Sequence, residues 1–437
     1  MRLPTLLNAA LTLPNGQSIA NRIAKAAMTE GLADTSAYPS PALERLYAKW
    51  AHSGCGVLIT GNVMIDRQHL ERPGNVVIDR IPDADMRTSL SAWAHAAQSG
   101  GAKIWMQVNH AGRQTQVTIN PHPKAPSAIK LGLPGKKFGV PQALTEAEIL
   151  ELVERFANAA LVARDTGFDG VQIHAAHGYL LSSFLNPRAN QRRDAWGGSL
   201  ENRARMLLET VNAVRAKTGD DFTVTVKLNS ADFQKGGFSF VDCTEVVKWL
   251  AQHQVDLIEI SGGNYEQARM MDLGGIEERD VSGLPPATKA REAYFADFAA
   301  QMLRDVRVPL MVTGGFRSAA AMESAIADDG IAMIGIGRPM CVDTDCVQKL
   351  LRGEITQLEQ WEKRLRLGSG WLGPRSPFNI VRMLNGFGVT YWFYQQLRRI
   401  GRGQPVAREL SVFSALRSEL KEQQGWWLVA SRSGLKA

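Results

Sequence analysis

The feature that most constrains the fold is an alternation of short apolar segments with longer helical patterns, repeated eight times along the chain. Each apolar segment is rich in Val, Ile, Leu or Met, as expected of strands that are buried on both faces. The strands are expected at Ile23–Thr29, Gly56–Val63, Lys103–Val108, Asp169–His174, Phe222–Leu228, Val255–Ser261, Val308–Gly314 and Ile331–Gly337. The helical patterns are Ala42–Ser53, Asp83–Gln98, Glu146–Thr166, Leu200–Lys217, Cys243–His253, Lys289–Arg304, Ser318–Asp328 and Asp345–Arg352.

Eight strand–helix units in order predict an α/β chain folded as a (β/α)8 barrel, or TIM barrel. A doubly wound parallel sheet is the alternative, but that fold seldom repeats the unit eight times. Ahead of the first strand, the Asn15-Gly16 pair within Leu11–Ile19 predicts an N-terminal hairpin that closes the barrel floor. We expect residues 1–360 to form the barrel and residues 361–437 to form a basic, aromatic-rich C-terminal helical extension.

The composition is that of an ordinary globular protein, with 45% hydrophobic and 21% charged residues among 437. No apolar run approaches the ~18 residues of a spanning helix, and the first residues do not resemble a secretion signal. The four cysteines form no Cys-x-x-Cys pair, which argues against a disulfide framework or a cysteine-bound metal. We therefore expect a cytoplasmic protein without an integral membrane segment.

The net charge of +7 comes from the extension, and the first 360 residues carry no basic excess. Nucleic acid is therefore not an expected partner. Within the extension, Arg398 and Arg399 follow the aromatic run Tyr391–Tyr394. The favoured interpretation is a helical appendage that packs its aromatic residues on the side of the barrel and leaves the arginines in solvent. A membrane-surface or subunit contact, including a homo-oligomer, is the alternative.

The residues Ile173-His-Ala-Ala-His-Gly-Tyr179 mark the end of the fourth expected strand. Long loops follow the third, fourth and sixth strands, so the extra length lies at the C-terminal mouth where barrel enzymes keep their active sites. There His174, His177 and Tyr179 can hydrogen-bond a substrate oxygen and supply a proton. A metal-dependent barrel lyase or hydrolase, with the two histidines as ligands, is the alternative reading, although no third ligand is evident.

Glycines end the last two strands, where barrels commonly bind phosphate. Gly314 and Gly315 precede a helix, and Gly337 is followed by Arg338. Backbone N–H groups at such glycines approach an anion closely, and a guanidinium can form two hydrogen bonds to a phosphate. The sequence therefore predicts a ligand that carries a phosphate.

With these motifs in this order, the chain resembles the Old Yellow Enzyme family of FMN-dependent NAD(P)H oxidoreductases, which includes the ene-reductases. The most specific match is the run from Asn186 to Arg203, which contains Gly197-Gly198-Ser199 and has Trp196 where the family usually has Tyr. This run reads as scaffold, with Ser199 capping a helix and Glu201 in its first turn. Further matches are Ala26–Thr29, Gln107–Arg113 and the two glycine loops.

The resemblance implies a role for each matching residue. Ala27, Met28 and Thr29 would line the flavin, Gly61 would leave room beside the ring, and Gln107 would pair with the pyrimidine edge. Lys227 would stabilise negative charge on the reduced flavin, although many relatives have Arg there. Gly314, Gly315, Gly337 and Arg338 belong to the phosphate loops.

The implied reaction uses NADH or NADPH to reduce FMN, which then transfers a hydride to an activated alkene such as an enone. His174 and His177 would bind the carbonyl oxygen of this small-molecule substrate, and Tyr179 would protonate its α-carbon. Asn109 stands where some members have a bulky aromatic residue near the flavin. The pocket size is therefore open, as are the alkene and the choice of coenzyme.

Overall fold

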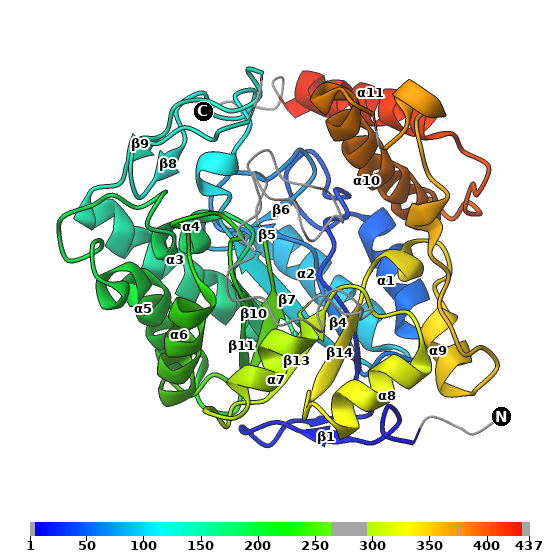
Figure 1. Ribbon diagram of the computed structural model, residues 1–437, viewed down its shortest axis with the longest axis horizontal. Helices are drawn as coiled ribbons and strands as arrows, with labels where there is room; N and C mark the ends of the chain where they lie inside the picture. The colour runs from blue at the N-terminus through cyan, green and yellow to red at the C-terminus, as the bar shows by residue number, and fades with distance from the viewer. Residues whose placement is uncertain (1–4, 134, 264–294, 375, 431–437) are drawn as a thin grey trace.

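The computed structural model describes residues 5–133, 135–263, 295–374 and 376–430, and it contains a closed barrel of eight parallel strands (Figure 1). Pairing of the last strand with the first closes the barrel, which confirms the predicted fold. The strands are β3 (Ile23–Lys25), β4 (Val57–Ile59), β7 (Lys103–Asn109), β10 (Gly170–Ala175), β11 (Thr223–Asn229), β12 (Leu257–Ser261), β13 (Leu310–Thr313) and β14 (Met333–Ile336).

Helices surround the barrel, and several begin at the side-chain caps that the sequence contains. The hydroxyl of Thr145 accepts a hydrogen bond from the backbone N–H of Glu148, whose carboxylate accepts from the backbone N–H of Thr145. Ser199 caps the next long helix, as predicted. The outer helices are α1 (Pro41–Ala51), α2 (Ala84–Gln98), α3 (Glu146–Asp165), α5 (Leu200–Thr218), α6 (Phe240–Gln252), α7 (Ala296–Met302), α8 (Ala319–Ala327) and α9 (Cys346–Leu351).

The predicted N-terminal hairpin is present as β1 (Leu11–Thr12) and β2 (Ser18–Ile19), at the bottom of Figure 1. Gly16 has φ +85°, a backbone conformation that glycine adopts without strain. The side chain of Asn15 donates a hydrogen bond of 2.9 Å to Thr223 Oγ1 at the start of β11. The hairpin therefore covers the N-terminal ends of the strands, opposite the C-terminal mouth of the barrel.

Short elements fill the loops at the other end of the barrel. They are β5 (Val63–Met64), β6 (Val76–Val77), η1 (Gly112–Gln114), β8 (Lys124–Ala125), β9 (Gln142–Ala143) and α4 (Leu180–Leu185). The predicted loop 262–288 lies almost wholly outside the described residues, as does the first part of the helix expected at 289–304. The first barrel strand ends at Lys25 rather than Thr29 because residues 26–29 leave the sheet to line a cavity.

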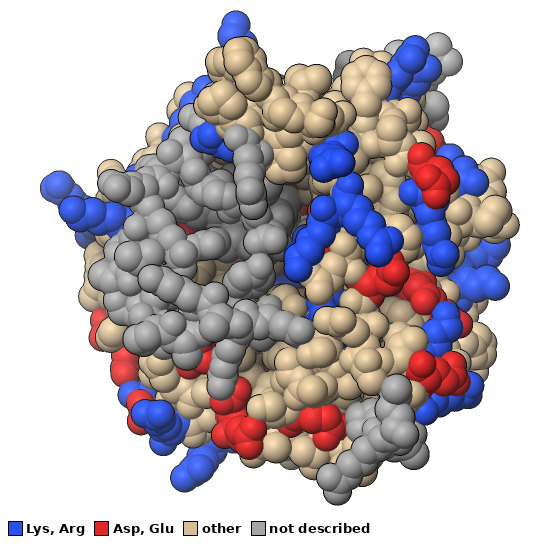
Figure 2. All heavy atoms as spheres, turned by 45° about the vertical axis from the view of Figure 1, so that its right-hand side comes forward, with Lys and Arg blue, Asp and Glu red and all other residues tan. Residues whose placement is uncertain are grey.

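Two long helices, α10 (Asn379–Gly401) and α11 (Val412–Ala430), form the extension at the top right of Figure 1. Trp392 is fully buried, and its ring stacks on Trp361 with 6.0 Å between ring centroids. Figure 2 shows Lys and Arg side chains grouped on the side of the molecule that carries these helices. Within the described part of the chain, no helix is long and apolar enough to cross a bilayer.

A buried ion cluster joins the extension to the barrel loops. The carboxylate of Glu419 in α11 is fully buried and contacts the guanidinium groups of Arg72 and Arg398. The Arg72 guanidinium also lies 3.9 Å from the centroid of the Tyr394 ring. Arg398 is 6% exposed, so the expectation that this arginine points into solvent is wrong. Its charge is instead used to hold the two C-terminal helices against each other and against the loop that carries Arg72.

We predict that Glu419→Ala destabilises the protein strongly, because the buried Arg72 guanidinium would lose its carboxylate and the buried Arg398 guanidinium would keep only Glu422. Loss of one partner from a buried ion cluster costs about 3–5 kcal/mol in free energy of unfolding. Urea denaturation measures the change. Glu354→Ala is the control, since its ion pair with Arg352 is exposed on both sides and contributes at most about 1 kcal/mol. Equal effects of the two substitutions would contradict the importance of the buried cluster.

Candidate functional site

A cavity of about 660 Å³ lies at the C-terminal ends of the barrel strands. It gathers residues that are far apart in the sequence, from Ala26 at the end of β3 to Leu397 in α10. All but one of the site residues expected from the sequence line it, and Gly61 is the exception. Those present are Ala27, Met28, Thr29, Gln107, His174, His177, Tyr179, Lys227, Gly314, Gly315, Gly337 and Arg338.

A chain of buried polar side chains runs across the barrel interior beneath this cavity. Gln107 donates a hydrogen bond of 2.7 Å to Gln172, which in turn donates one of 2.8 Å to Glu259. The other oxygen of Glu259 lies 2.7 Å from Lys227 Nζ, and both side chains are nearly inaccessible to solvent. One of the two N–H donors of the Gln107 amide is therefore occupied, which fixes the orientation of the amide. Gln172 and Glu259 were not among the expected site residues.

His174 is a neutral hydrogen-bond donor in this setting. Burial, and then the positive charge of Lys227, hold the pKa of His174 well below its ordinary value. The Nδ1 atom of the ring accepts a hydrogen bond of 3.1 Å from the backbone N–H of Ala176. A neutral ring that accepts at Nδ1 carries its proton on Nε2. The second nitrogen is thus available as a donor on a ring that lines the cavity.

His177 is held in a left-handed backbone conformation, with φ +63°. Non-glycine residues pay roughly 1–2 kcal/mol for this conformation, so the surrounding contacts must hold it in place. The backbone N–H of His177 donates to Asn229 Oδ1 at 3.1 Å, and its carbonyl accepts from the Gln114 amide at 3.0 Å. The ring Nε2 lies 2.8 Å from Ser261 Oγ. Burial and the charge of Lys227 also keep the pKa of His177 well below normal.

Tyr179 lies beside the two histidines. Its ring meets the ring of His174 edge-on, with 4.9 Å between centroids and an interplanar angle of 87°. The side chain is 5% exposed and packs in a small apolar cluster with Met64, Leu70 and Ala111. This packing fixes the direction of the phenol, so the structure brings all three expected catalytic residues to one wall of the cavity.

The opposite end of the cavity is basic. Gly314 and Gly315 have φ values of +128° and +86°, conformations that favour glycine. Arg338 lines this end together with Arg317 and Lys363, which were not expected. The Arg317 guanidinium is held by Glu362 at 2.5 Å, and Arg338 lies 4.0 Å from the same carboxylate. Arg317 follows the Gly-Gly-Phe sequence directly, a signal that was available in the sequence.

The segment around Thr29 is tied to neighbouring strands by side-chain amides. Asn109 donates to Asn62 at 3.0 Å, and Asn62 donates to the Thr29 hydroxyl at 3.2 Å. Asn109 is itself buried beneath Asn62 and does not line the cavity. Gly61 faces Glu30 instead of the cavity, and its backbone N–H donates a hydrogen bond to the Glu30 carboxylate. A Cβ atom at this position would lie 2.1 Å from the Glu30 carboxylate and 2.5 Å from the Met28 carbonyl oxygen. Glycine is thus required there for backbone packing.

The C-terminal extension supplies one wall of the cavity. The side of α10 that faces the barrel contributes polar, aliphatic and aromatic surface, from Asn385, Gly386, Val389, Thr390, Phe393, Tyr394 and Leu397. The expected division of the chain at residue 360 stays a prediction, but residues from both sides of it form the same site. The functional unit therefore includes the extension.

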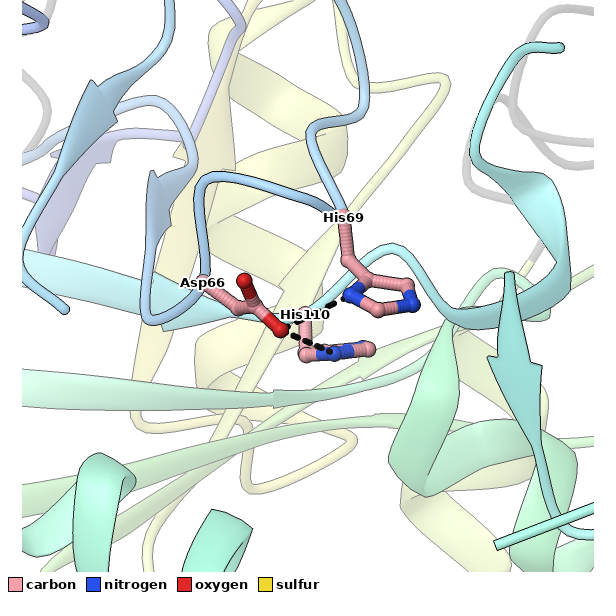
Figure 3. Close-up of side chains that lie close together, drawn as sticks. All are labelled: Asp66, His69 and His110. Atoms are coloured by element: carbon pink, nitrogen blue, oxygen red, sulfur yellow. Dashed lines mark hydrogen bonds and ion pairs between the residues drawn. The ribbon is translucent and has the colours of Figure 1, made fainter. Parts of the chain in front are cut away.

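A second cluster of titratable residues, Asp66, His69 and His110, lies outside the cavity (Figure 3). Among the described residues, these three have ligand atoms close enough together, within 4.8 Å, to suggest a metal site. Their hydrogen bonds indicate another role. His69 Nε2 accepts from the backbone N–H of Lys124 at 2.8 Å, and His110 Nδ1 accepts from that of Gly112 at 3.1 Å.

Both neutral rings therefore carry their protons on the nitrogens that face Asp66, at 2.8 Å for His69 and 3.7 Å for His110. Burial alone would raise the pKa of Asp66, but the nearby His110 ring and the hydrogen bond from His69 outweigh it and hold the pKa below its ordinary range. The His110 carbonyl accepts from the N–H of Leu180, the residue after Tyr179. The cluster is thus a scaffold that anchors the loop carrying Tyr179.

This scaffold predicts a pH dependence of stability. Burial lowers the pKa of His110 to about 4, whereas the ordinary value is 6.5. Between these values the unfolded chain takes up a proton that the folded protein does not, so His110 reduces the free energy of unfolding as pH falls from 6.5 to 4. The reduction is up to about 3 kcal/mol. Urea denaturation across this range should show a shallower pH slope for His110→Asn.

The matched control is His122→Asn, which changes an exposed histidine in the loop between β7 and α3. This variant should keep the wild-type slope. An unchanged slope in His110→Asn would show that the His110 proton is not coupled to folding.

Comparison with known proteins places the chain in a family. Residues 9–357 match the model of the NADH:flavin oxidoreductase / NADH oxidase family. A NADH-dependent flavin oxidoreductase of Hypocrea jecorina is 38% identical over 359 residues, which cover 78% of this chain and 86% of that protein. The NADH oxidase of Thermoanaerobacter brockii is 30% identical over 402 residues, which cover 91% of this chain and 56% of the longer relative.

Solved structures support the same fold. The Old Yellow Enzyme homologue of Zymomonas mobilis superposes with a TM-score of 0.66 at 23% identity, over 81% of this chain and 94% of that one. Morphinone reductase, solved in complex with tetrahydroNAD, gives a TM-score of 0.65 at 22% identity, over 81% of this chain and 92% of that one. These likenesses show the barrel, while the matching sequence over residues 9–357 identifies the relationship. The chain is a flavin-dependent oxidoreductase of the NADH:flavin oxidoreductase / NADH oxidase family.

Proposed function

We propose that this flavin oxidoreductase uses NADH or NADPH to reduce the carbon–carbon double bond of an α,β-unsaturated carbonyl compound. The observation that carries the proposal is the neutral His174 ring, protonated on Nε2 and packed edge-on against Tyr179 in the cavity wall. A neutral donor binds a carbonyl oxygen without giving up its proton. The phenol beside it is then left as the acid.

The cavity residues fit FMN. Two glycines with positive φ, followed by Arg317, and the Gly337-Arg338 pair supply backbone N–H groups and charge for a phosphate. The hydroxyl of Thr313 lines the same cavity and has no hydrogen-bond partner among the described residues. Gln107 and Lys227 would hold the pyrimidine edge, and Ala27, Met28 and Thr29 would lie along the ring. When bound, FMN supplies the hydride chemistry.

The residues of this chain would bind the substrate, supply the proton and exclude water. His174 and His177 would hold the substrate carbonyl oxygen and stabilise the negative charge that develops on it. Both stay uncharged because they are buried near Lys227, so they act through hydrogen bonds rather than as acids. Tyr179 would deliver the proton to the α-carbon. Residues of α10 would exclude water from the opposite wall.

We expect Tyr179→Phe to separate the two halves of the reaction. Reduction of the FMN-loaded enzyme by NADH or NADPH should stay close to the wild-type rate, because it requires no proton on substrate carbon. Reoxidation by an enone should slow by ~10²–10⁴-fold, the usual contribution of a general acid. Stopped-flow absorbance measures both rates. Wild-type reoxidation in Tyr179→Phe would contradict the proposed acid.

The identity of the cofactor is checked on the same preparation. Heat release followed by chromatography should give FMN, and release of FAD would overturn the proposed site. His174→Asn serves as a matched variant, since it should weaken binding of carbonyl ligands and leave the proton donor in place. This variant therefore separates substrate binding from protonation.

Because Lys227 is paired with Glu259, we predict that removing the charge of Glu259 changes the redox potential of the bound flavin. Glu259→Gln keeps a hydrogen-bond acceptor for Gln172 but removes the negative charge beside Lys227. The uncompensated ammonium group should favour a reduced, anionic flavin. We expect the midpoint potential of the FMN-loaded protein to rise by roughly 30 mV, equivalent to about 1.4 kcal/mol for a two-electron couple.

Spectroscopic redox titration tests this expectation. Glu151→Gln, the same substitution on an exposed helical surface, is the control and should leave the potential unchanged. A potential that stays constant or falls in Glu259→Gln would show that Lys227 does not act on the flavin.

A further inference from the structure

Large apolar side chains are exposed at the start of the extension, over residues 371–384. Trp371 is 74% exposed, Leu372 60%, Phe378 51% and Ile380 59%, and Leu384 is also exposed. We call these five residues the apolar patch. Exposed apolar residues are ordinary when they are scattered singly, but a group of this kind marks an interaction site.

Several contacts hold the patch together. The rings of Trp371 and Phe378 meet with 6.0 Å between centroids. Ile380 and Leu384 are four residues apart in α10 and therefore lie on one face of the helix. The buried side chain of Asn385 donates a hydrogen bond of 2.9 Å to the Leu372 carbonyl, which fixes the preceding turn against α10.

The patch lies in a strongly basic part of the chain. From Lys363 to Arg408 the sequence contains nine Lys and Arg residues and neither Asp nor Glu, although Arg398 is buried against Glu419 and adds no surface charge. The side chains of Lys363, Arg364, Arg366 and Arg382 are exposed. Figure 2 shows basic side chains on this side of the molecule. A partner that covers the patch must therefore accept both apolar side chains and a concentrated positive charge.

We propose that the apolar patch and the basic residues around it dock the enzyme on a membrane surface that contains anionic lipids. Aromatic side chains settle at the boundary between headgroups and acyl chains, and each nearby Lys or Arg adds attraction to anionic headgroups. Association with a second copy through the same patch is less favourable, because a two-fold contact would bring two basic surfaces together.

Docking by this surface also sets the position of the active-site cavity. The same segment contributes Lys363, Leu365, Arg366 and Pro374 to the cavity lining. The docked enzyme therefore holds its basic end next to the headgroups. A lipophilic electron acceptor dissolved in the bilayer is then close to the site. This last step rests on the proposed function, whereas membrane binding itself does not.

The test is sedimentation of the full-length, FMN-loaded protein with two kinds of vesicle, phosphatidylcholine alone and phosphatidylcholine mixed with phosphatidylglycerol. We expect binding to the mixed vesicles, weaker binding as salt is raised, and little binding to phosphatidylcholine alone. Replacement of both Trp371 and Phe378 by Ser should reduce the partition coefficient at least about tenfold. Arg364→Gln should reduce it about fivefold, as expected for one basic residue near an anionic surface.

Matched controls lie on the barrel. Ile81→Ser removes an apolar side chain that is 86% exposed, and Arg352→Gln removes an exposed guanidinium. Neither should alter vesicle binding, and all variants should oxidise NADH or NADPH at wild-type rates. Vesicle binding that survives the Trp371/Phe378 double substitution would overturn the proposal.

Failure of the wild-type enzyme to bind the mixed vesicles would also overturn it. Light scattering gives the second readout. If the wild type does not bind vesicles and the double substitution dissociates an oligomer, the patch is a contact between copies of the chain. Vesicle binding needs no turnover, so failure to bind vesicles would not contradict the proposed reaction. In the same way, a lack of activity on enones would not contradict membrane binding.

Discussion

The ion pair between Lys227 Nζ and Glu259 Oε1 spans two adjacent strands, β11 and β12, inside the barrel. Two buried charges are tolerated there because each has a close partner, and because Gln172 donates to the second oxygen of Glu259. The same pair orients Gln107 through Gln172, and after burial the charge of Lys227 is the next cause that lowers the pKa of both cavity histidines. Cofactor-facing and substrate-facing residues thus depend on one interaction.

The sequence predicted those parts of the fold that rest on local patterns. Eight apolar segments became eight barrel strands, Asn15-Gly16 formed the hairpin turn, and Ser199 capped its helix. Strand ends were less accurate. Residues 26–29 are as apolar as the strand before them, so only tertiary structure shows that they leave the sheet to line the cavity.

Site residues at or just beyond the C-terminal end of a strand were accessible to the same reasoning, because parallel strands place their ends at one mouth. His174, Lys227 and Arg338 are examples. Glu259 was not predicted because its role depends on Lys227, a residue of a neighbouring strand 32 positions away. The sequence did not predict the roles of Lys363 and of the wall formed by α10 for a stronger reason. They lie beyond the eight-unit repeat, and nothing local shows that the extension folds back over the mouth.

The contact between Arg72 and Glu419 has a consequence for the order of assembly. The two residues are 347 positions apart, so a ribosome that adds roughly 5–20 residues per second needs about 17–70 s to pass from one to the other. Throughout that interval the nascent chain carries an arginine without its final partner, and once β14 has closed the barrel the cavity still lacks one wall. Cofactor capture during synthesis would therefore precede completion of the wall formed by α10, and release of a chain that ends before α10 would leave the cavity open on that side.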